Sequence, residues 1–242
     1  MDKILILDFG SQYTQLIARR IREQQVYCEI HPYNYSIEKI KDFQPKAIVL
    51  SGGPSSVYAE NAPRLDPSFF DLSYPMLGIC YGMQLMGKML GGKVEASSRR
   101  EYGRAMVEVD DSKDFFKGVK SKTQVWMSHG DHVVQVPSGF EKIGHSENSP
   151  IAAMAHRAQK KFAVQFHPEV THSEEGTQII RNFLFEIAQC QPNWTMKGFI
   201  QSEIENIRQK VGKDRVICAT SGGVDSTVAA HLVHQAIGDQ LT

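Results

Sequence analysis

The segment Gly78-Ile79-Cys80-Tyr81-Gly82 places a cysteine between two glycines. An apolar run precedes it and apolar residues recur at helical spacing after it, so Cys80 stands at a predicted strand-to-helix turn. Glycines lack a Cβ atom and allow a tight turn with an exposed central side chain. The helix that begins near Tyr81 directs its positive end at the sulfur and favours a thiolate. The pattern predicts a nucleophile, although a free cysteine more often only packs in a core.

A second motif, Phe162–Glu169, is an apolar run that ends in a histidine and a glutamate two positions apart. Side chains two apart on an extended chain point the same way, and Pro168 favours an extended backbone at His167. An imidazole can take a proton from a thiol and return it to a leaving amine, and a carboxylate can orient that imidazole. We therefore expect Cys80, His167 and Glu169 to form a catalytic triad. A histidine that stood alone at a strand end would more simply be a satisfied polar residue.

The loop at residues 51–56 fits the same site, because it follows a predicted buried strand at 47–50 and contains two adjacent glycines. Attack on an amide carbon creates an oxyanion, which backbone N–H groups usually stabilise. One donor belongs to the residue after the nucleophile and the other to a neighbouring strand-end loop. We expect these donors to be Tyr81 and Gly53. An ordinary turn is the alternative, and a phosphate loop is disfavoured because the Gly-Lys-Ser/Thr ending is missing.

These residues together resemble the class I glutamine amidotransferases, over Met1 to about Gln189. The resemblance implies that Cys80 forms a γ-glutamyl thioester, that His167 is the general acid and base, and that Glu169 orients His167. It also implies a glutamine site that comprises Gly52, Gln84, Ser128, His129 and Asp131. In the family, backbone groups near residues 128 and 129 hold glutamine, the carboxylate at 131 lies near its ammonium, and the side chain at 84 contacts it. By pattern alone, residues 128–131 are only a polar turn.

Strand and helix patterns alternate along the first part of the chain. Residues 4–7, 26–30 and 47–50 read as strands, and 15–22 reads as a helix. This alternation predicts an α/β fold with an open, mostly parallel twisted sheet and helices on both faces. Ligand sites in such sheets lie beyond the carboxyl ends of the strands, where the three proposed loops would meet.

Length and composition agree with one complete domain and part of a second, since the chain has 242 residues of which 41% are hydrophobic. The 27 basic and 27 acidic residues balance, which argues against nucleic acid or a membrane surface as a partner. The four cysteines are scattered without Cys-x-x-Cys spacing, so we expect neither disulfides nor a metal site, and a cytoplasmic protein. The first apolar run is too short for a signal peptide.

A second organisation begins after a polar segment at 190–195. We expect a glutaminase domain at 1–189, a linker at 190–195, and the beginning of another α/β domain at 196–242. Thr195 would cap a helix that Gly212 ends. A short strand at 216–219 would then lead into the loop Ser221–Thr227 and a further helix, an arrangement that can cradle an anion.

The loop Ser221–Thr227 lacks the lysine of a Walker sequence and resembles the pyrophosphate-binding loop of the ATP pyrophosphatases. A tight strand-to-helix turn is the alternative. The ATP-binding residues implied by the resemblance are Ser221, Gly222, Gly223, Val224, Asp225, Ser226 and Thr227. A triad glutaminase followed by this loop resembles the glutamine-hydrolysing GMP synthases, in which glutamine supplies ammonia for the amination of XMP.

That family uses ATP and Mg²⁺ as co-substrates, needs no cofactor for the glutaminase step, and forms homodimers. Because the family continues beyond the position of Thr242, we expect this chain to retain only the glutaminase half. Two alternatives remain at this level. One is a stand-alone γ-glutamyl hydrolase, and the other is a non-catalytic module with the same fold.

Overall fold

The computed structural model describes the side chains of residues 1–96 and 101–242. The chain divides into two compact units, Met1–Asn193 and Trp194–Thr242. The break between them falls inside the segment 190–195, where the sequence places a linker. Within the described residues, every helix is too short or too polar to cross a lipid bilayer.

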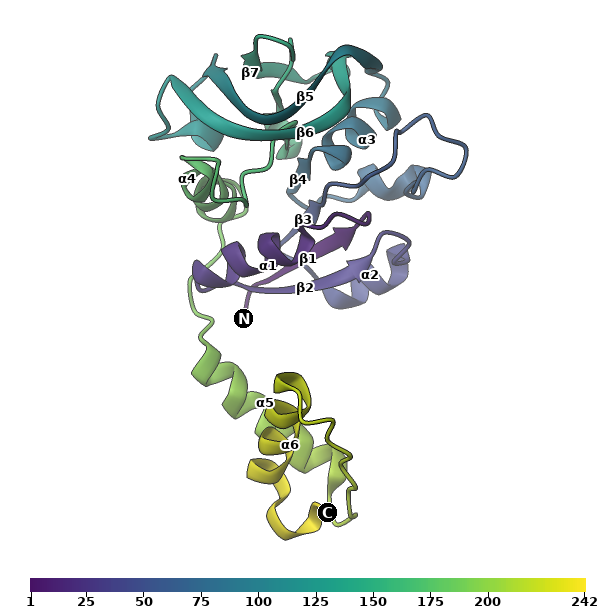
Figure 1. Ribbon diagram of the computed structural model, residues 1–242, viewed down its shortest axis with the longest axis vertical. Coiled ribbons are helices and arrows are strands. Elements are labelled where there is room, and N and C mark those ends of the chain that lie inside the picture. Colours follow the sequence, from purple (N-terminus) through teal and green to yellow (C-terminus); the bar gives the residue numbers. More distant parts are fainter. The chain divides into compact units, whose positions relative to one another are not determined.

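The first unit is built on a nine-stranded sheet in the order β2-β1-β3-β4-β9-β8-β7-β5-β6 (Figure 1). The strands are β1 Lys3–Asp8, β2 Tyr27–Pro32, β3 Ala47–Leu50, β4 Met76–Ile79, β5 Lys93–Val109, β6 Lys122–Gln135, β7 Glu141–Ser146, β8 Ala153–His156 and β9 Lys161–Val164. The five strands from β2 to β9 pair in parallel, as the sequence predicted. The other four pair antiparallel, and β5 and β6 form a long curved ribbon (Figure 1). The sequence patterns gave no indication of this antiparallel extension.

Helices cover both faces of the sheet, which confirms the predicted α/β architecture. The helices are α1 Thr14–Glu23, α2 Ile37–Phe43, α3 Tyr81–Met89 and α4 Gly176–Asn182. Shorter helical turns lie at Pro67–Asp71, Asp114–Phe116, Arg157–Gln159 and, with π geometry, Phe183–Ile187. Strand β1 shows how the layers form, because its residues alternate between two cores. Ile4 and Ile6 pack with residues of α1 and α4, while Leu5 and Leu7 pack with residues of α2 and α3.

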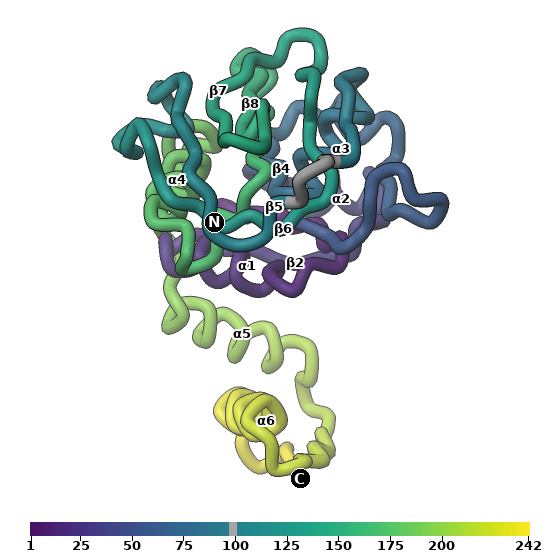
Figure 2. Tube along the Cα trace, turned by 45° about the horizontal axis from the view of Figure 1, so that its top comes forward, coloured from purple at the N-terminus to yellow at the C-terminus, as the bar shows by residue number. Residues whose placement is uncertain are grey.

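The second unit is a helical hairpin in which α5 (Met196–Val211) contacts α6 (Val224–Ile237), followed by a short turn at Gly238–Gln240 (Figure 2). Thr195 caps α5 by accepting a hydrogen bond from the N–H of Gly198 at 3.1 Å, and Gly212 follows its last turn with φ +58°. The strand predicted at residues 216–219 is wrong. Only a single bridge forms there, between Val216 and Leu241, because the described residues of this unit offer no other strand to pair with.

Candidate active site

Cys80 lies between the end of β4 and the start of α3, in a strained backbone conformation with φ 51° and ψ −104°. Positive φ is uncommon for a residue with a Cβ atom, and such strain clusters at functional sites. The flanking glycines are required by close packing. A Cβ on Gly78 would lie 2.8 Å from the carbonyl of Gly82, and one on Gly82 would lie 2.5 Å from the carbonyl oxygen of Leu50. Glycine is therefore required at both positions, because the backbone around this strand-to-helix turn packs too closely for side chains to fit.

His167 and Glu169 follow β9, but not on an extended strand. Strand β9 ends at Val164, bends follow at residues 165 and 166, and a turn lies at 168 and 169, so the expectation of a straight strand through 169 is wrong. The pair nevertheless meets, because Nδ1 of His167 and Oε1 of Glu169 are 2.8 Å apart. A carboxylate opposite Nδ1 fixes the proton on that nitrogen and leaves Nε2 for proton exchange.

The backbone of His167 is held from both sides. Its N–H donates to the carbonyl of Trp126 at 3.0 Å, and the hydroxyl of Ser173 donates to its carbonyl at 2.6 Å. The same hydroxyl accepts the N–H of Trp126 at 3.0 Å, so Ser173 ties β6 to the histidine turn. The ring of Tyr13 packs edge-on against the imidazole at 5.0 Å between centroids. These contacts restrict the imidazole to one orientation.

Electrostatics favour a charged imidazole. Burial alone would lower the pKa of His167, but the carboxylate of Glu169 and the interaction with Cys80 outweigh burial and raise this pKa from 6.5 to about 10. A protonated imidazole stabilises a neighbouring thiolate, because each ion lowers the cost of burying the other. The arrangement therefore places a charged proton donor beside the thiol of Cys80.

Cys80 and His167 line one cavity of about 610 Å³. Its other walls are residues 10–13, 53–56, Gln84, Tyr102 and 128–131. The loops that follow β1, β3, β4 and β9 thus meet at one edge of the sheet, and the long strand β6 closes the opposite wall. Of the triad and glutamine-site residues predicted from the sequence, this cavity brings together Cys80, His167, Gln84 and the segment 128–131.

The predicted oxyanion donors lie beside the thiol. Tyr81 is the first residue of α3, and Gly53 follows β3. Among the described residues, no backbone hydrogen bond occupies the N–H of either residue. Gly52 lies directly against the catalytic pair, since a Cβ built there would be 3.0 Å from Cε1 of His167 and 3.6 Å from Cβ of Cys80. Gly53 lines the same cavity as Cys80, and Tyr81 follows Cys80 directly in the chain.

The segment 128–131 lies in β6 and faces the strand-to-helix turn that carries Cys80. Sγ of Cys80 is 3.6 Å from the carbonyl oxygen of Ser128, and Nε2 of Gln84 donates to the carbonyl of Asp131 at 2.7 Å. Oδ2 of Asp131 is buried and has no hydrogen-bond partner among the described residues. A buried carboxylate oxygen of this kind favours a cationic partner such as an ammonium group. The ring of His129 is directed elsewhere, toward Glu101.

The structure adds Gln165, which the sequence patterns do not mark. Its side chain is fully buried, and Nε2 lies 3.7 Å from Sγ of Cys80. Its Oε1 accepts a bond from Gln84 at 3.3 Å, so one amide connects the nucleophile to the predicted glutamine contact. Gln165 stands two positions before His167, and that proximity to the motif is the only signal that could have pointed to it.

In the second unit, the loop Ser221–Thr227 runs into the N-terminus of α6. The hydroxyls of Ser226 and Thr227 both donate to the carbonyl of Gly223, at 3.0 and 2.9 Å, and Oγ of Ser221 lies 3.2 Å from that of Ser226. Residues 221–225 are exposed. The first N–H groups of a helix lack intrahelical acceptors, so this end of α6 can receive an anion. No cluster of metal-ligating side chains occurs among the described residues.

Comparisons with known proteins bear on the family to which the chain belongs. The sequence profile of the family Glutamine amidotransferase class-I matches residues 5–187. The chain is 55% identical over 241 residues to a GMP synthase [glutamine-hydrolyzing] of Brachyspira hyodysenteriae and 56% identical over 240 residues to that of Caldanaerobacter subterraneus. These alignments cover 100% and 99% of this chain but 47% of each relative, so the chain spans about half their length.

Among solved structures, a protein from Thermoplasma acidophilum described as a "putative gmp synthase subunit a protein" superimposes with a TM-score of 0.69 and 31% identity. The match covers 78% of this chain and 94% of that protein. The family profile extends over most of the chain and includes Cys80, His167 and Glu169. The chain therefore belongs to the class I glutamine amidotransferases.

Proposed function

We propose that the first unit hydrolyses glutamine to glutamate and ammonia through Cys80, His167 and Glu169. The observation that carries the proposal is the placement of Cys80 and His167 in one cavity, with Glu169 2.8 Å from the imidazole. The cavity of about 610 Å³ is large enough for an amino acid. Asp131 and Gln84 lie in its wall, where they would contact the ammonium and the polar atoms of glutamine.

In the first step, the thiolate of Cys80 attacks the side-chain carbonyl carbon of glutamine and the carbon–sulfur bond forms. The N–H groups of Gly53 and Tyr81 stabilise the negative oxygen, which is the largest contribution such sites make to the rate. As the carbon–nitrogen bond breaks, His167 gives its proton to the departing ammonia. A γ-glutamyl thioester remains on Cys80.

Water then attacks the thioester while His167 takes one of its protons. The carbon–sulfur bond breaks, glutamate leaves, and the thiolate returns. Glu169 keeps the imidazole in the orientation that serves both steps and stabilises its positive charge. Gly52 allows the imidazole to approach the thiol closely, since any side chain there would contact the ring.

We also propose that the ammonia serves the ATP-dependent amination of XMP to GMP in the full-length protein. The relatives that support this are named GMP synthase [glutamine-hydrolyzing] and match this chain over its whole length. The residues of the loop Ser221–Thr227 fit the pyrophosphate of ATP, because exposed N–H groups and hydroxyls gather at the start of α6. Mg²⁺ would then arrive with ATP as part of the substrate.

A cytoplasmic location and a homodimeric full-length protein complete the proposal. The location is supported by the four cysteines, all of which are free. The dimer rests on the family resemblance.

The decisive experiment measures glutamate released from glutamine by the parent chain and by Cys80→Ala and His167→Ala. Residues that act as one catalytic unit give large and non-additive losses. We expect each substitution to abolish most of the activity, and the double variant to lose little more. Losses below about tenfold in both single variants, equivalent to roughly 1.4 kcal/mol, would refute the triad. Parallel assays with γ-glutamyl peptides test the alternative of a general γ-glutamyl hydrolase.

A further inference from the structure

A buried polar cluster lies behind the glutamine strip, which is the segment 128–131 of β6. Its centre is the carboxylate of Glu101 on β5, and its other members are His129, Ser146 and Ser149. All four are buried, with exposed fractions between 0% and 7%. None of them belongs to the triad. Several buried polar groups together destabilise the folded state unless their hydrogen bonds are complete. The arrangement of this cluster therefore needs a functional explanation.

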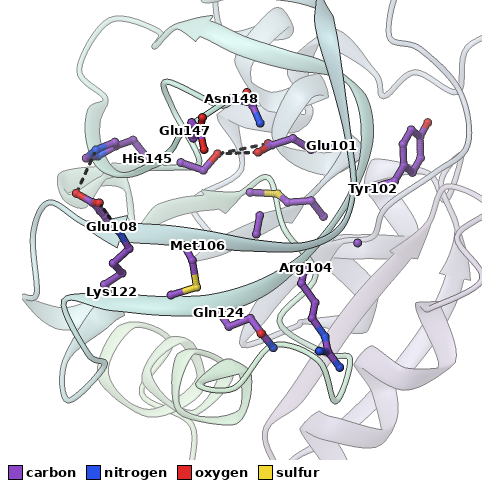
Figure 3. Close-up of a pocket in the computed structure, with 14 residues that line it drawn as sticks. Glu101, Tyr102, Arg104, Met106, Glu108, Lys122, Gln124, His145, Glu147 and Asn148 are labelled. Carbon is purple, nitrogen blue, oxygen red and sulfur yellow. Dashed lines mark hydrogen bonds and ion pairs between the residues drawn. The ribbon is translucent and has the colours of Figure 1, made fainter.

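Glu101 is fully engaged. It accepts the hydroxyl of Ser149 at 2.6 Å and that of Ser146 at 3.1 Å, and Nε2 of His129 lies 3.2 Å from its Oε2. Figure 3 shows Glu101 in the wall of a second cavity, of about 810 Å³, formed by the β5–β6 ribbon and the end of β7. His129 contacts Glu101 through Nε2 and is also one of the residues that line the catalytic cavity. The cluster therefore contributes side chains to the walls of both cavities.

The charge of the cluster follows from its hydrogen bonds. Nδ1 of His129 lies 3.0 Å from the carbonyl oxygen of Asp131, and Nε2 faces the carboxylate of Glu101. Both neighbours are acceptors, so each ring nitrogen must carry a proton for both bonds to form. The hydroxyl of Ser149 also lies 3.5 Å from Nε2, but it donates to Glu101 at the much shorter distance of 2.6 Å. Two serine hydroxyls that donate to Glu101 favour its charged form. Burial alone would raise the pKa of Glu101, but its bonds to His129 and the serines lower it to about 2.

The cluster controls the position of Asp131. The carbonyl of Asp131 receives two donors, Nδ1 of His129 and Nε2 of Gln84 at 2.7 Å. These two bonds fix the backbone from which Oδ2 of Asp131 projects, a buried atom with no hydrogen-bond partner among the described residues. A neutral His129 would retain only one N–H and would lose either the bond to Asp131 or the bond to Glu101.

We propose that Glu101 and His129 form a buried ion pair that holds the glutamine strip in place and thereby sets the affinity for glutamine. The inference deepens the proposed glutaminase function and rests on it. Glu101 is a positioning residue, since it acts on the substrate through His129 and Asp131. Among the described residues, the other titratable groups near the pair include Asp131 and His132 on β6, Glu95 and Tyr102 on β5, and Cys80 and His167 across the cavity.

The charge state is tested first, on the whole chain, by nitrogen-15 NMR of the histidine side chains from pH 5 to 9. We expect both ring nitrogens of His129 to be protonated at pH 7 and Glu101→Gln to convert the ring to its neutral form at that pH. His129→Asn assigns the signals. A neutral His129 at pH 7 in the parent overturns the ion pair, whatever the activity of the chain.

The role in binding is tested by glutaminase kinetics of Glu101→Gln. Loss of a hydrogen bond to a charged group costs about 1.5–3 kcal/mol, so KM for glutamine should rise roughly tenfold to a hundredfold. The value of kcat and the rate at which iodoacetamide alkylates Cys80 should stay within about threefold of the parent values, because iodoacetamide does not bind to the glutamine strip. The matched control is Glu108→Gln on the same strand, whose carboxylate pairs with Lys122 at the surface, at 3.0 Å. It should behave as the parent.

The outcomes separate the two proposals. If the parent hydrolyses glutamine and Glu101→Gln leaves KM unchanged, the inference fails while the glutaminase stands. If the parent has no glutaminase activity, both statements about glutamine fall, and NMR still decides the ion pair. Should Glu101→Gln not fold, Ser149→Ala removes a single donor to the carboxylate and should raise KM about threefold; an unchanged KM in that folded variant equally overturns the role.

Discussion

Gly52→Ala should impair the chemical step without unfolding the protein. The added Cβ would lie 3.0 Å from Cε1 of His167, whereas ordinary contacts of a Cβ begin near 3.4 Å. The backbone of Gly52 does not occupy the left-handed region, so alanine is not excluded by its φ angle. The neighbouring atom is part of a side chain, and the ring can yield. The imidazole must therefore retreat from the thiol by about 0.4 Å.

The size of the effect follows from this displacement. A misplacement of about 1 Å can cost on the order of a hundredfold in rate, so 0.4 Å corresponds to a loss of about five- to tenfold in kcat. This equals roughly 1 kcal/mol of transition-state stabilisation. The assay is steady-state hydrolysis at saturating glutamine, together with the alkylation rate of Cys80 and the thermal midpoint of unfolding.

Gly144→Ala is the matched control, because its added Cβ would meet the carbonyl oxygen of Glu108 at 3.3 Å, away from the catalytic cavity. We expect the control to keep its kcat and to change only in thermal midpoint. A Gly52→Ala variant with kcat within twofold of the parent would refute the reasoning. An equal loss of kcat in both variants would do so as well, since it would show a general effect of strain.

Three further predictions concern stability. The raised pKa of His167 contributes stability that is complete below pH 6.5 and is lost as the pH rises through about 10. In urea titrations, Glu169→Gln should therefore lower the free energy of unfolding more at pH 6 than at pH 10.5. Equal losses at the two pH values would contradict the pairing of His167 with Glu169. Ser173→Ala leaves the N–H of Trp126 without its acceptor and should cost about 1–3 kcal/mol, with a lower kcat, whereas an unchanged midpoint would contradict the tie. In hydrogen exchange, amides of residues 194–242 should exchange before those of β1 and β3, because only three apolar side chains form the buried cluster of that unit; equal protection would contradict this.

The parallel half of the fold could be predicted because its strands carry their own signals. Strand β3 was predicted with its observed bounds, since four consecutive apolar residues followed by two glycines identify a buried parallel strand and its exit. The strand at 216–219 was wrong for the complementary reason. An apolar run becomes a strand only where a partner strand runs beside it over several residues. Here the backbone hydrogen bonds to residues 240–242 form one isolated bridge and no longer ladder.

The chemistry of the site could be predicted further than its geometry. Cys80, His167 and Glu169 are recognisable because their types and neighbours are unusual, yet the straight strand assumed for His167 is a turn after Val164. The predicted contact between His167 and Glu169 still forms, because the carboxylate needs only to reach Nδ1 of the imidazole, and a turn allows that as readily as a strand. Gln165 carries no unusual neighbours, so only its buried contact with Sγ of Cys80 marks it.

The antiparallel strands explain which residues the sequence could not assign. The triad and the oxyanion donors lie on loops after β3, β4 and β9, within the part of the sheet whose order can be argued from local patterns. The glutamine strip lies on β6, and its supports come from β5 and β7, with 45 positions between Glu101 and Ser146. Such contacts depend on strand order and register, which local periodicity does not specify. The catalytic residues can therefore be recognised from short sequence motifs. The residues that position the substrate lie on strands β5–β7, whose pairing joins segments far apart in the sequence. Substitutions in β5–β7 should accordingly change KM for glutamine more than kcat, and Glu101→Gln tests this most directly.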